Sequence, residues 1–257
     1  MRPVSVARVL EREWLVYRRL WRGLAFTMFG QPVMYLVAMG VGLGSLVDAH
    51  SGSVGGLPYL DFVAPGLMVA SAVQLAAVES LWPVLAGVMW MRYYEGLVAT
   101  TVEPAELYTG VVVWTAGKAM MGAVVYLVVA GALGAVSSPL GLLAIPATGL
   151  CAAAFAAPIA AYAIGRESDV TFTFLVRVVI LPLFLFSGTF FPVSEMPLVL
   201  ERLAVCSPLW HGTELARAAT TGTGSAAAIL GHLAFLVAIV ALGGWWGTRA
   251  FTRRLRS

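Results

Sequence analysis

The chain has 257 residues, of which 60% are hydrophobic and only 11% are charged, and its mean hydropathy is +0.88. A soluble chain is about half apolar and about a quarter charged, so this composition excludes an ordinary globular enzyme and indicates a protein whose surplus apolar surface faces lipid. A helix needs about 20 apolar residues to cross a bilayer, which leaves room for about six spans and none for a separate catalytic domain of about 100 residues. We therefore expect an all-α membrane protein with a single transmembrane domain over residues 1–257.

The N-terminal stretch is basic and amphipathic. Apolar and aromatic residues recur at steps of three and four from Val6 to Leu24, which places them on one face of a helix, whereas the charged residues fall mostly on the other faces. Such a helix lies in the headgroup plane of a membrane, with its rings at the acyl boundary and its arginines toward anionic lipid. We predict an interfacial helix over residues 4–22 rather than a cleavable signal peptide.

Sparse charged residues divide the rest of the chain into apolar segments. The expected transmembrane helices cover about residues 23–47, 59–91, 107–136, 140–165, 170–191 and 226–248. A Gly- and Ser-rich loop over residues 48–58 separates the first two spans, and Ser137-Ser138-Pro139 turns the chain between the third and the fourth. Residues 166–169 form a short polar turn before the fifth span. Pro104 fits the first turn of the third.

Positive charges set the orientation of these spans. Short cytoplasmic segments collect Lys and Arg, and an N-terminus on the inside leaves only Arg202 and Arg217 in the outer segments. The cytoplasmic side then carries Arg2, Arg8, Arg12, Arg18, Arg19, Arg22, Arg92, Arg166, Arg249, Arg253, Arg254 and Arg256. Both termini are therefore predicted to be cytoplasmic, which requires an even number of crossings.

Three ionisable residues, Glu79, Lys118 and Arg177, lie inside otherwise apolar spans. An unpaired charge there costs about 2.5 to 3.5 kcal/mol, so each should have a partner or a functional role. Counting along the helices from the predicted cytoplasmic ends places Glu79 and Arg177 in the inner third of the membrane and Lys118 near mid-depth. Glu79 can then pair with Arg177 or Lys118. The three side chains can lock helices together, line a substrate path or couple transport to protons.

No catalytic or metal-binding pattern is found in the sequence. The three histidines, His50, His211 and His232, have no metal-ligand spacing, and G-x-S-x-G is missing. Gly117-Lys118 resembles the end of a phosphate-binding loop, but Ala119 occupies the position at which that motif needs Ser or Thr to bind magnesium. We expect His232 to make an interhelical hydrogen bond. Enzyme activity on this chain, a metal site and a nucleic-acid partner are not expected.

The connection between the fifth and sixth spans is too apolar for a free loop and too often interrupted by proline for a span. Its distinctive residues are Phe190, Phe191, Pro192, Pro208, Trp210 and His211. A short re-entrant helix pair, buried in protein near the outer leaflet, satisfies both constraints. Trp210 and His211 would suit the membrane interface.

The order of these elements resembles the membrane subunit of type-2 ABC exporters. The stretches that carry the resemblance are Gln31-Pro32 with Gly40-x-Gly42-x-Gly44, and residues 59–67, 94–100, 187–192, 207–211 and 214–217. The most similar branch contains the nodulation lipo-oligosaccharide exporters and the daunorubicin-type drug exporters. Thr101 departs from the family pattern, because members usually have Pro at that position.

The resemblance implies that the cytoplasmic segment after the second span docks into a groove of a separate ATPase subunit, which would hold ATP and Mg²⁺. The expected coupling residues are Arg92, Tyr93, Tyr94, Glu95, Gly96, Thr100 and Thr101. An ordinary solvated turn is the alternative for this segment. No cofactor is expected on the chain itself.

The resemblance also implies a function in export across the bacterial cytoplasmic membrane. Two permease subunits, identical or related, would enclose a path through the lipid for an amphipathic cargo such as a lipid-linked saccharide, a glycolipid or a hydrophobic drug. An apolar conduit suits such cargo better than it suits ions. A proton-coupled secondary carrier that uses Glu79, Lys118 and Arg177 is the alternative function.

Overall fold

The computed structural model describes residues 3–25, 30–44, 47 and 53–256, and its named secondary-structure elements are all helices. In chain order they are α1 (Pro3–Ala25), α2 (Gln31–Leu36), the π-helix η2 (Val37–Leu43), α4 (Tyr59–Leu85), the π-helix η3 (Ala86–Trp90), α5 (Tyr93–Val98), α6 (Pro104–Ala132), the 3-10 helix η4 (Pro139–Leu143), α7 (Ala144–Ala163), α8 (Val170–Leu175), the π-helix η5 (Val176–Ile180), α9 (Leu181–Phe186), the 3-10 helix η6 (Val193–Glu195), α10 (Leu198–Val205), α11 (Pro208–Thr221) and α12 (Ala226–Arg256). The all-α prediction is confirmed.

Four helical segments among the described residues are long and apolar enough to cross a membrane. They are Tyr59–Trp90 (α4 with η3), Pro104–Ala132 (α6), Pro139–Ala163 (η4 with α7) and Ala226–Arg256 (α12). Each exceeds the roughly 20 residues that a bilayer requires. They correspond to the second, third, fourth and sixth predicted spans, and α12 continues beyond the predicted end at residue 248.

The other two predicted spans are only partly matched. The fifth corresponds to α8, η5 and α9, which together form a shorter apolar segment, Val170–Phe186. The first is represented by the end of α1 and by α2 and η2, while residues 26–29 and 45–46 of that span lie outside the described residues. Residues 48–52 of the expected loop lie outside them as well.

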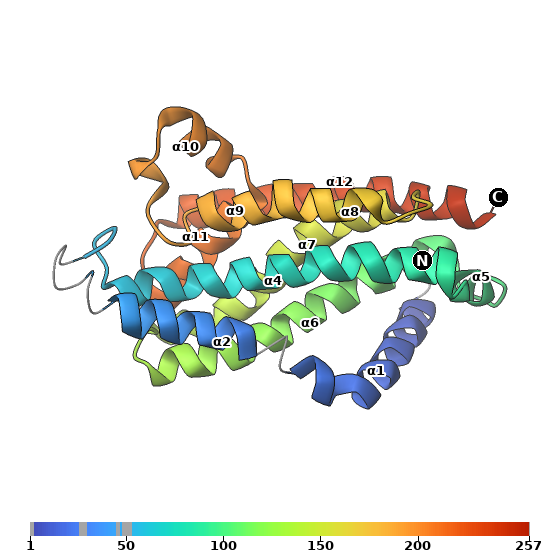
Figure 1. Ribbon diagram of the computed structural model, residues 1–257, viewed down its shortest axis with the longest axis horizontal. Helices are drawn as coiled ribbons and strands as arrows, with labels where there is room; N and C mark the ends of the chain where they lie inside the picture. Colours follow the sequence, from blue (N-terminus) through green and yellow to red (C-terminus); the bar gives the residue numbers. More distant parts are fainter. Residues whose placement is uncertain (1–2, 26–29, 45–46, 48–52, 257) are drawn as a thin grey trace.

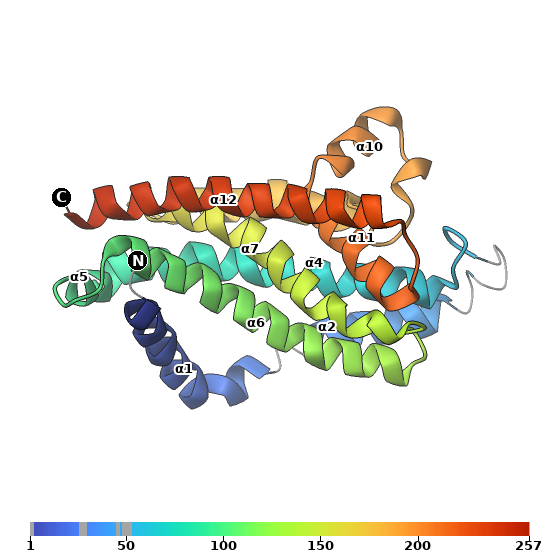
Figure 2. The same cartoon turned by 180° about the vertical axis from the view of Figure 1, so that it is seen from behind.

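The long helices run side by side along the longest axis of the molecule, and α7 contacts α4, α6, α11 and α12 (Figures 1 and 2). The buried face of α7 consists largely of alanine. Small residues let helix backbones approach closely in lipid, where van der Waals contact drives association. At one such contact, a Cβ atom on Gly243 of α12 would lie 2.8 Å from the Cβ of Ala157 of α7. Only glycine fits this approach.

The two ends of the bundle differ (Figure 1). One end carries α5 and the C-terminus of α12, and we call it the α5 end. The other carries α10 and the turn around residues 53–57, and we call it the α10 end. Helix α1 crosses α6 toward the α5 end, where Val9 is buried against Gly110 and the Trp14 and Tyr17 rings meet Trp114. The amphipathic helix predicted at 4–22 therefore forms, and part of its apolar face packs on protein.

Local signals define where several helices begin and end. The Glu103 and Glu106 side chains form a reciprocal capping box at the start of α6, and Pro104 occupies its first turn as predicted. Arg92 has a left-handed backbone with φ of 51°, which ends the α4–η3 helix and redirects the chain into α5. Ser207 caps α11 by accepting a hydrogen bond from the backbone N–H of Leu209.

Candidate functional site

Helix α5 is a short helix that projects from the α5 end of the bundle (Figure 1). It follows the left-handed turn at Arg92, a conformation that is uncommon for a residue with a side chain. The Arg92 guanidinium forms an exposed ion pair with Glu95, with 2.9 Å between Nη2 and Oε1. This pair links the turn to the first turn of α5.

Tyr94 anchors α5 to the bundle. Its side chain is buried, its ring lies 6.1 Å from that of Phe251 in α12, and a Cβ atom on Gly87 would lie 2.8 Å from the ring. Burial raises the pKa of the Tyr94 phenol well above its usual value, so the hydroxyl stays neutral at physiological pH. Because Tyr94 contacts both η3 and α12, movement of α5 would be transmitted to both.

Helix α1 braces the same segment from the side. The Arg12 guanidinium carbon lies 3.9 Å from the centre of the Tyr93 ring, a cation–π contact, and Arg8 Nη1 donates a hydrogen bond to Thr101 Oγ1 at 3.3 Å. Burial is the main reason that the pKa of Tyr93 is raised. The hydroxyl of Thr101 thus bonds to α1.

The structure separates the predicted coupling residues into two groups. Tyr94 faces the bundle and Tyr93 lies beneath Arg12, so both hold α5 in place. The exposed group consists of Arg92, Glu95, Gly96, Thr100 and Thr101. Sequence spacing could not separate the groups, because the direction in which α5 leaves the bundle is set by the turn at Arg92.

The intramembrane charges are brought together in part. Lys118 Nζ of α6 and Glu79 Oε2 of α4 form an ion pair, and the same ammonium group lies 5.8 Å from the centre of the Trp114 ring. Only 7% of the Lys118 side chain and 23% of the Glu79 side chain are exposed. Of the two partners that the sequence allowed for Glu79, the structure selects Lys118.

Arg177 lies apart from this pair. It is exposed on the π-helix η5, on a surface that also exposes Phe174, Val178 and Leu181. No ion pair of Arg177 is found within the described residues. An exposed cation in an apolar segment is costly in hydrocarbon, so this surface is better suited to protein or water than to lipid.

The outer connection contains two helices with different surroundings. Helix α11 is buried against α4, α7 and α12, with Leu209, Gly212 and Leu215 among its buried residues. Helix α10 stands away from the bundle and exposes Leu198 and Val199 (Figure 1). Helix α11 thus packs between the long helices, whereas α10 is exposed, so the expected re-entrant helix pair is not confirmed.

Arg217 fixes α11 to the rest of the α10 end. Its guanidinium is buried and donates to the carbonyl oxygens of Phe62, at 3.3 and 3.2 Å, and of Gly188, at 2.8 Å, while Nη1 pairs with Glu214. Its Cζ lies 3.9 Å from the centre of the Phe62 ring. Phe62 belongs to α4, and Gly188 lies in the segment between α9 and η6, so one side chain joins three parts of the chain.

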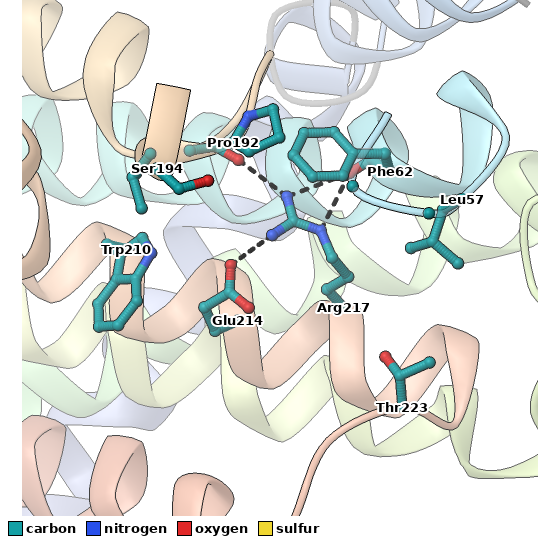
Figure 3. A pocket seen from close by; sticks show the side chains of 12 residues that line it. Leu57, Phe62, Pro192, Ser194, Trp210, Glu214, Arg217 and Thr223 are labelled. Atoms are coloured by element: carbon teal, nitrogen blue, oxygen red, sulfur yellow. Dashed lines mark hydrogen bonds and ion pairs between the residues drawn. The ribbon is translucent and has the colours of Figure 1, made fainter. Parts of the chain in front are cut away.

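A pocket of about 430 Å³ opens beside this arginine (Figure 3). Its walls come from the 53–57 turn, the start of α4, the segment 188–194 and α11. Of the residues predicted for the outer segment, Pro192 and Trp210 line it. Phe190 packs edge-on against Phe184, with 5.5 Å between ring centres, and Phe191 is at the surface.

His211 and His232 meet between α11 and α12. Their Nδ1 atoms are 2.8 Å apart, and the His211 ring stacks on Phe235 with 3.9 Å between ring centres. The predicted interhelical hydrogen bond of His232 is thus present. Its partner, His211, could not be predicted, because the two residues are 21 positions apart in the sequence. Within the described residues, no group of three or more His, Cys, Asp or Glu side chains could hold a metal ion.

The long apolar helices, with a short helix exposed at one end, define an integral membrane protein of the polytopic helical class. The ABC-2 type transporter family matches residues 5–220, and the chain belongs to that family. The chain is 30% identical to nodulation protein J of Sinorhizobium fredii strain NGR234 over 220 residues. The matched region covers 84% of this chain and 81% of that protein. Nodulation protein J of Rhizobium leguminosarum bv. viciae is 28% identical over 248 residues, covering 96% of this chain and 93% of that protein.

Proposed function

We propose that this chain is the membrane subunit of an ATP-driven exporter, whose ATPase is a separate polypeptide. Membership of the ABC-2 type transporter family supports a permease that is not catalytic by itself. ATP and Mg²⁺ would be held by the ATPase subunit. The observation that carries the proposal is α5, a short helix whose exposed residues face away from the bundle while Tyr94 ties it to η3 and α12.

The proposed topology has six spans in the bacterial cytoplasmic membrane. Four are the long apolar segments, the fifth is α8–η5–α9, and the first runs through α2 and η2. The α5 end would face the cytoplasm, because the arginines that close α12 lie there together with Arg92 and α1. The α10 end would then face outward, with α11 as the buried, re-entrant part of the outer segment.

The proposed coupling route starts at the exposed face of α5. A partner that pushes on Glu95 or Thr100 moves a helix whose anchor, Tyr94, is wedged between Gly87 and Phe251. Phe251 in turn packs against Tyr108, whose hydroxyl lies within hydrogen-bond distance of carbonyls in α7 and α12. This chain of packed rings would carry a rigid-body displacement from α5 into the spans.

A second permease subunit, identical or related, would cover the surface that contains Arg177. Leaving Arg177 in lipid would cost about 2.5 to 3.5 kcal/mol, whereas a subunit interface or a water-filled path would solvate or pair it. The cargo proposed for that path is amphipathic, such as a lipid-linked saccharide, a glycolipid or a hydrophobic drug. The alternative of a proton-coupled carrier built on all three intramembrane charges is not favoured, because Arg177 stands apart from the Glu79–Lys118 pair.

The test compares ATP hydrolysis by the chain alone and by the chain reconstituted with its ATPase subunit. The chain alone should show none, and the complex should hydrolyse ATP with cargo export. Glu95→Ala should lower turnover and export several-fold, because it removes an exposed charge of the docking face without touching a buried residue. Glu195→Ala, an exposed carboxylate at the α10 end, is the matched control and should leave both rates unchanged. ATP hydrolysis by the chain alone would overturn the proposal.

A further inference from the structure

Two imidazole rings, those of His211 in α11 and His232 in α12, meet across a helix contact. Their Nδ1 atoms are 2.8 Å apart, and the ring planes are inclined at 65° to each other with 5.0 Å between the ring centres. Both residues are half-buried, so the pair is not sealed inside the bundle. Because neutral imidazole is the commonest metal ligand among side chains, two such nitrogens held close together form a candidate metal site.

The protonation state of the pair is compatible with metal binding. A hydrogen bond between two Nδ1 atoms needs one donor and one acceptor, so at least one ring is neutral and has a free electron pair on that nitrogen. A neutral ring can carry its proton on Nε2 instead, and two rings in that form present both Nδ1 electron pairs to the space between α11 and α12.

The charged groups of the two helices do not oppose a cation at this place. Glu214, which follows His211 by three residues in α11, is paired with Arg217. The arginines of α12 lie at its far end, from Arg249 onward. A cation bound to His211 and His232 would therefore meet no uncompensated positive charge from either helix.

The separation of the two nitrogens indicates which ion fits. Metal–imidazole bonds are about 2.0 Å long, so two nitrogens on adjacent corners of a square lie about 2.8 Å apart, whereas two on a tetrahedron lie about 3.3 Å apart. The observed 2.8 Å matches the square arrangement. Square-planar or tetragonal coordination is typical of Cu²⁺ and Ni²⁺, and Cu²⁺ is the ion of the two that nitrogen ligands bind more tightly.

Aromatic neighbours from both helices restrain the rings. The His211 ring stacks on Phe235 of α12, with 3.9 Å between ring centres and 14° between the planes. Trp210 of α11 meets the His211 and His232 rings edge-on, with 4.9 and 5.0 Å between ring centres. The stack fixes the plane of the His211 ring, so the turn from hydrogen bond to coordination is made mainly by His232, about a torsion that is soft in histidine.

We infer that His211 and His232 bind one Cu²⁺ ion through their Nδ1 atoms and that this ion cross-links α11 to α12. Water completes the other corners of the square, because no third His, Cys, Asp or Glu side chain joins the pair in the part of the chain that the structure describes. A site with two protein ligands is open, so the ion binds reversibly and differs in this from a closed structural metal. Binding needs neither ATP nor cargo and does not depend on the exporter function proposed above.

The experiment uses the full chain, freed of any histidine tag, in lipid nanodiscs that hold one chain each at neutral pH. Cu²⁺ is added as its sulfate, and pulsed EPR spectroscopy counts the imidazoles on the ion by their remote nitrogens. We expect one Cu²⁺ per chain, with a tetragonal spectrum and two imidazoles, that Zn²⁺ displaces only in excess. A spectrum with fewer than two imidazoles, or tighter binding of Zn²⁺ than of Cu²⁺, would overturn the inference.

Three variants locate the ion. His211→Gln and His232→Gln each remove one imidazole but keep a polar side chain, and each should weaken Cu²⁺ binding about tenfold or more. His50→Gln is the matched control and should bind as the wild type does. The sequence has three histidines, so two imidazoles on the ion in His50→Gln can come only from His211 and His232, even where a pair variant fails to fold.

Thermal unfolding of the same proteins tests the cross-link. Cu²⁺ should raise the unfolding temperature of the wild type and of His50→Gln, because the ion binds the folded contact between α11 and α12 and not the unfolded chain. It should leave His211→Gln and His232→Gln unchanged. Two imidazoles that persist in both pair variants, or an equal rise in unfolding temperature in all four proteins, would place the ion elsewhere and refute the site.

Discussion

Replacing Glu79 by glutamine tests whether its ion pair with Lys118 holds α4 against α6. Lys118 is the more deeply buried partner, with 7% of its side chain exposed against 23% for Glu79. Glu79→Gln leaves that buried ammonium without its carboxylate, and we expect the free energy of unfolding to fall by about 3 kcal/mol. Lys118→Met leaves the less buried partner unpaired, so its loss should be smaller. The double variant removes both charges and should return to within about 1 kcal/mol of the wild type.

The assay is unfolding of the four purified proteins in the same lipid, analysed as a double-mutant cycle. Cargo export by the reconstituted complex is measured on the same variants. Full export by a stable Glu79→Gln/Lys118→Met protein would give the pair a purely structural role, and lost export in the same stable protein would place it on the substrate path. Additive losses of stability in the two single variants would refute the reasoning, because they would mean that the two charges do not interact.

Three further predictions concern the two ends of the bundle. Gly87→Ala would place a methyl group against the Tyr94 ring, so we expect a stability loss of about 1–3 kcal/mol and reduced partner-stimulated ATP turnover. Unchanged stability and turnover would contradict the close contact between Gly87 and Tyr94. Arg217→Lys replaces a planar guanidinium, which makes three hydrogen bonds to two carbonyls and pairs with Glu214, by a single ammonium group that cannot reproduce this geometry, and thermal unfolding should show a clear loss of stability. An impermeant maleimide added to intact cells should label exposed Cys206 but not buried Cys151; labelling of Cys206 only in inverted vesicles would reverse the orientation.

The helical segments could be predicted because their lengths follow from the hydrocarbon thickness and their ends from charged and capping residues. The segment from Tyr59 to Trp90 has bounds close to those expected from apolar length, and α12 begins at the expected residue but continues past the expected end at residue 248. Pro104 was placed correctly in the first turn of α6, since proline is tolerated where the helix has no N–H bond to lose. The fifth segment was predicted as one span over residues 170–191, and the structure has a shorter continuous apolar helix there, Val170–Phe186, with a π-helical turn around Arg177.

The partners of individual side chains could not be predicted in the same way. Glu79 had two possible partners, and only the packing of α4 on α6 selects Lys118. His211 and His232 showed no ligand-like spacing, yet the contact of α11 with α12 brings their rings together. Tyr94 was grouped with the docking residues because it belongs to the stretch 94–100 that carries the family resemblance, whereas in the structure its ring is buried in the bundle. The pocket beside Arg217 could not be predicted from the outer segment alone, because its walls also come from the distant stretch around Leu57 and Phe62.

The sequence by itself determined that this protein is a bundle of apolar helices with an amphipathic N-terminal helix and a short polar segment after the second span. These features depend on composition and on periodicity along one helix, both of which are local. Only the tertiary structure decided that α11 is buried while α10 is exposed, that α1 braces α5, and that Arg217 joins α4, α11 and the segment around Gly188. Those outcomes depend on which helices are in contact and on how each helix is rotated about its axis. Apolar helices pack through small residues, and a nearly uniform hydrophobic sequence does not indicate which of its faces makes the contact.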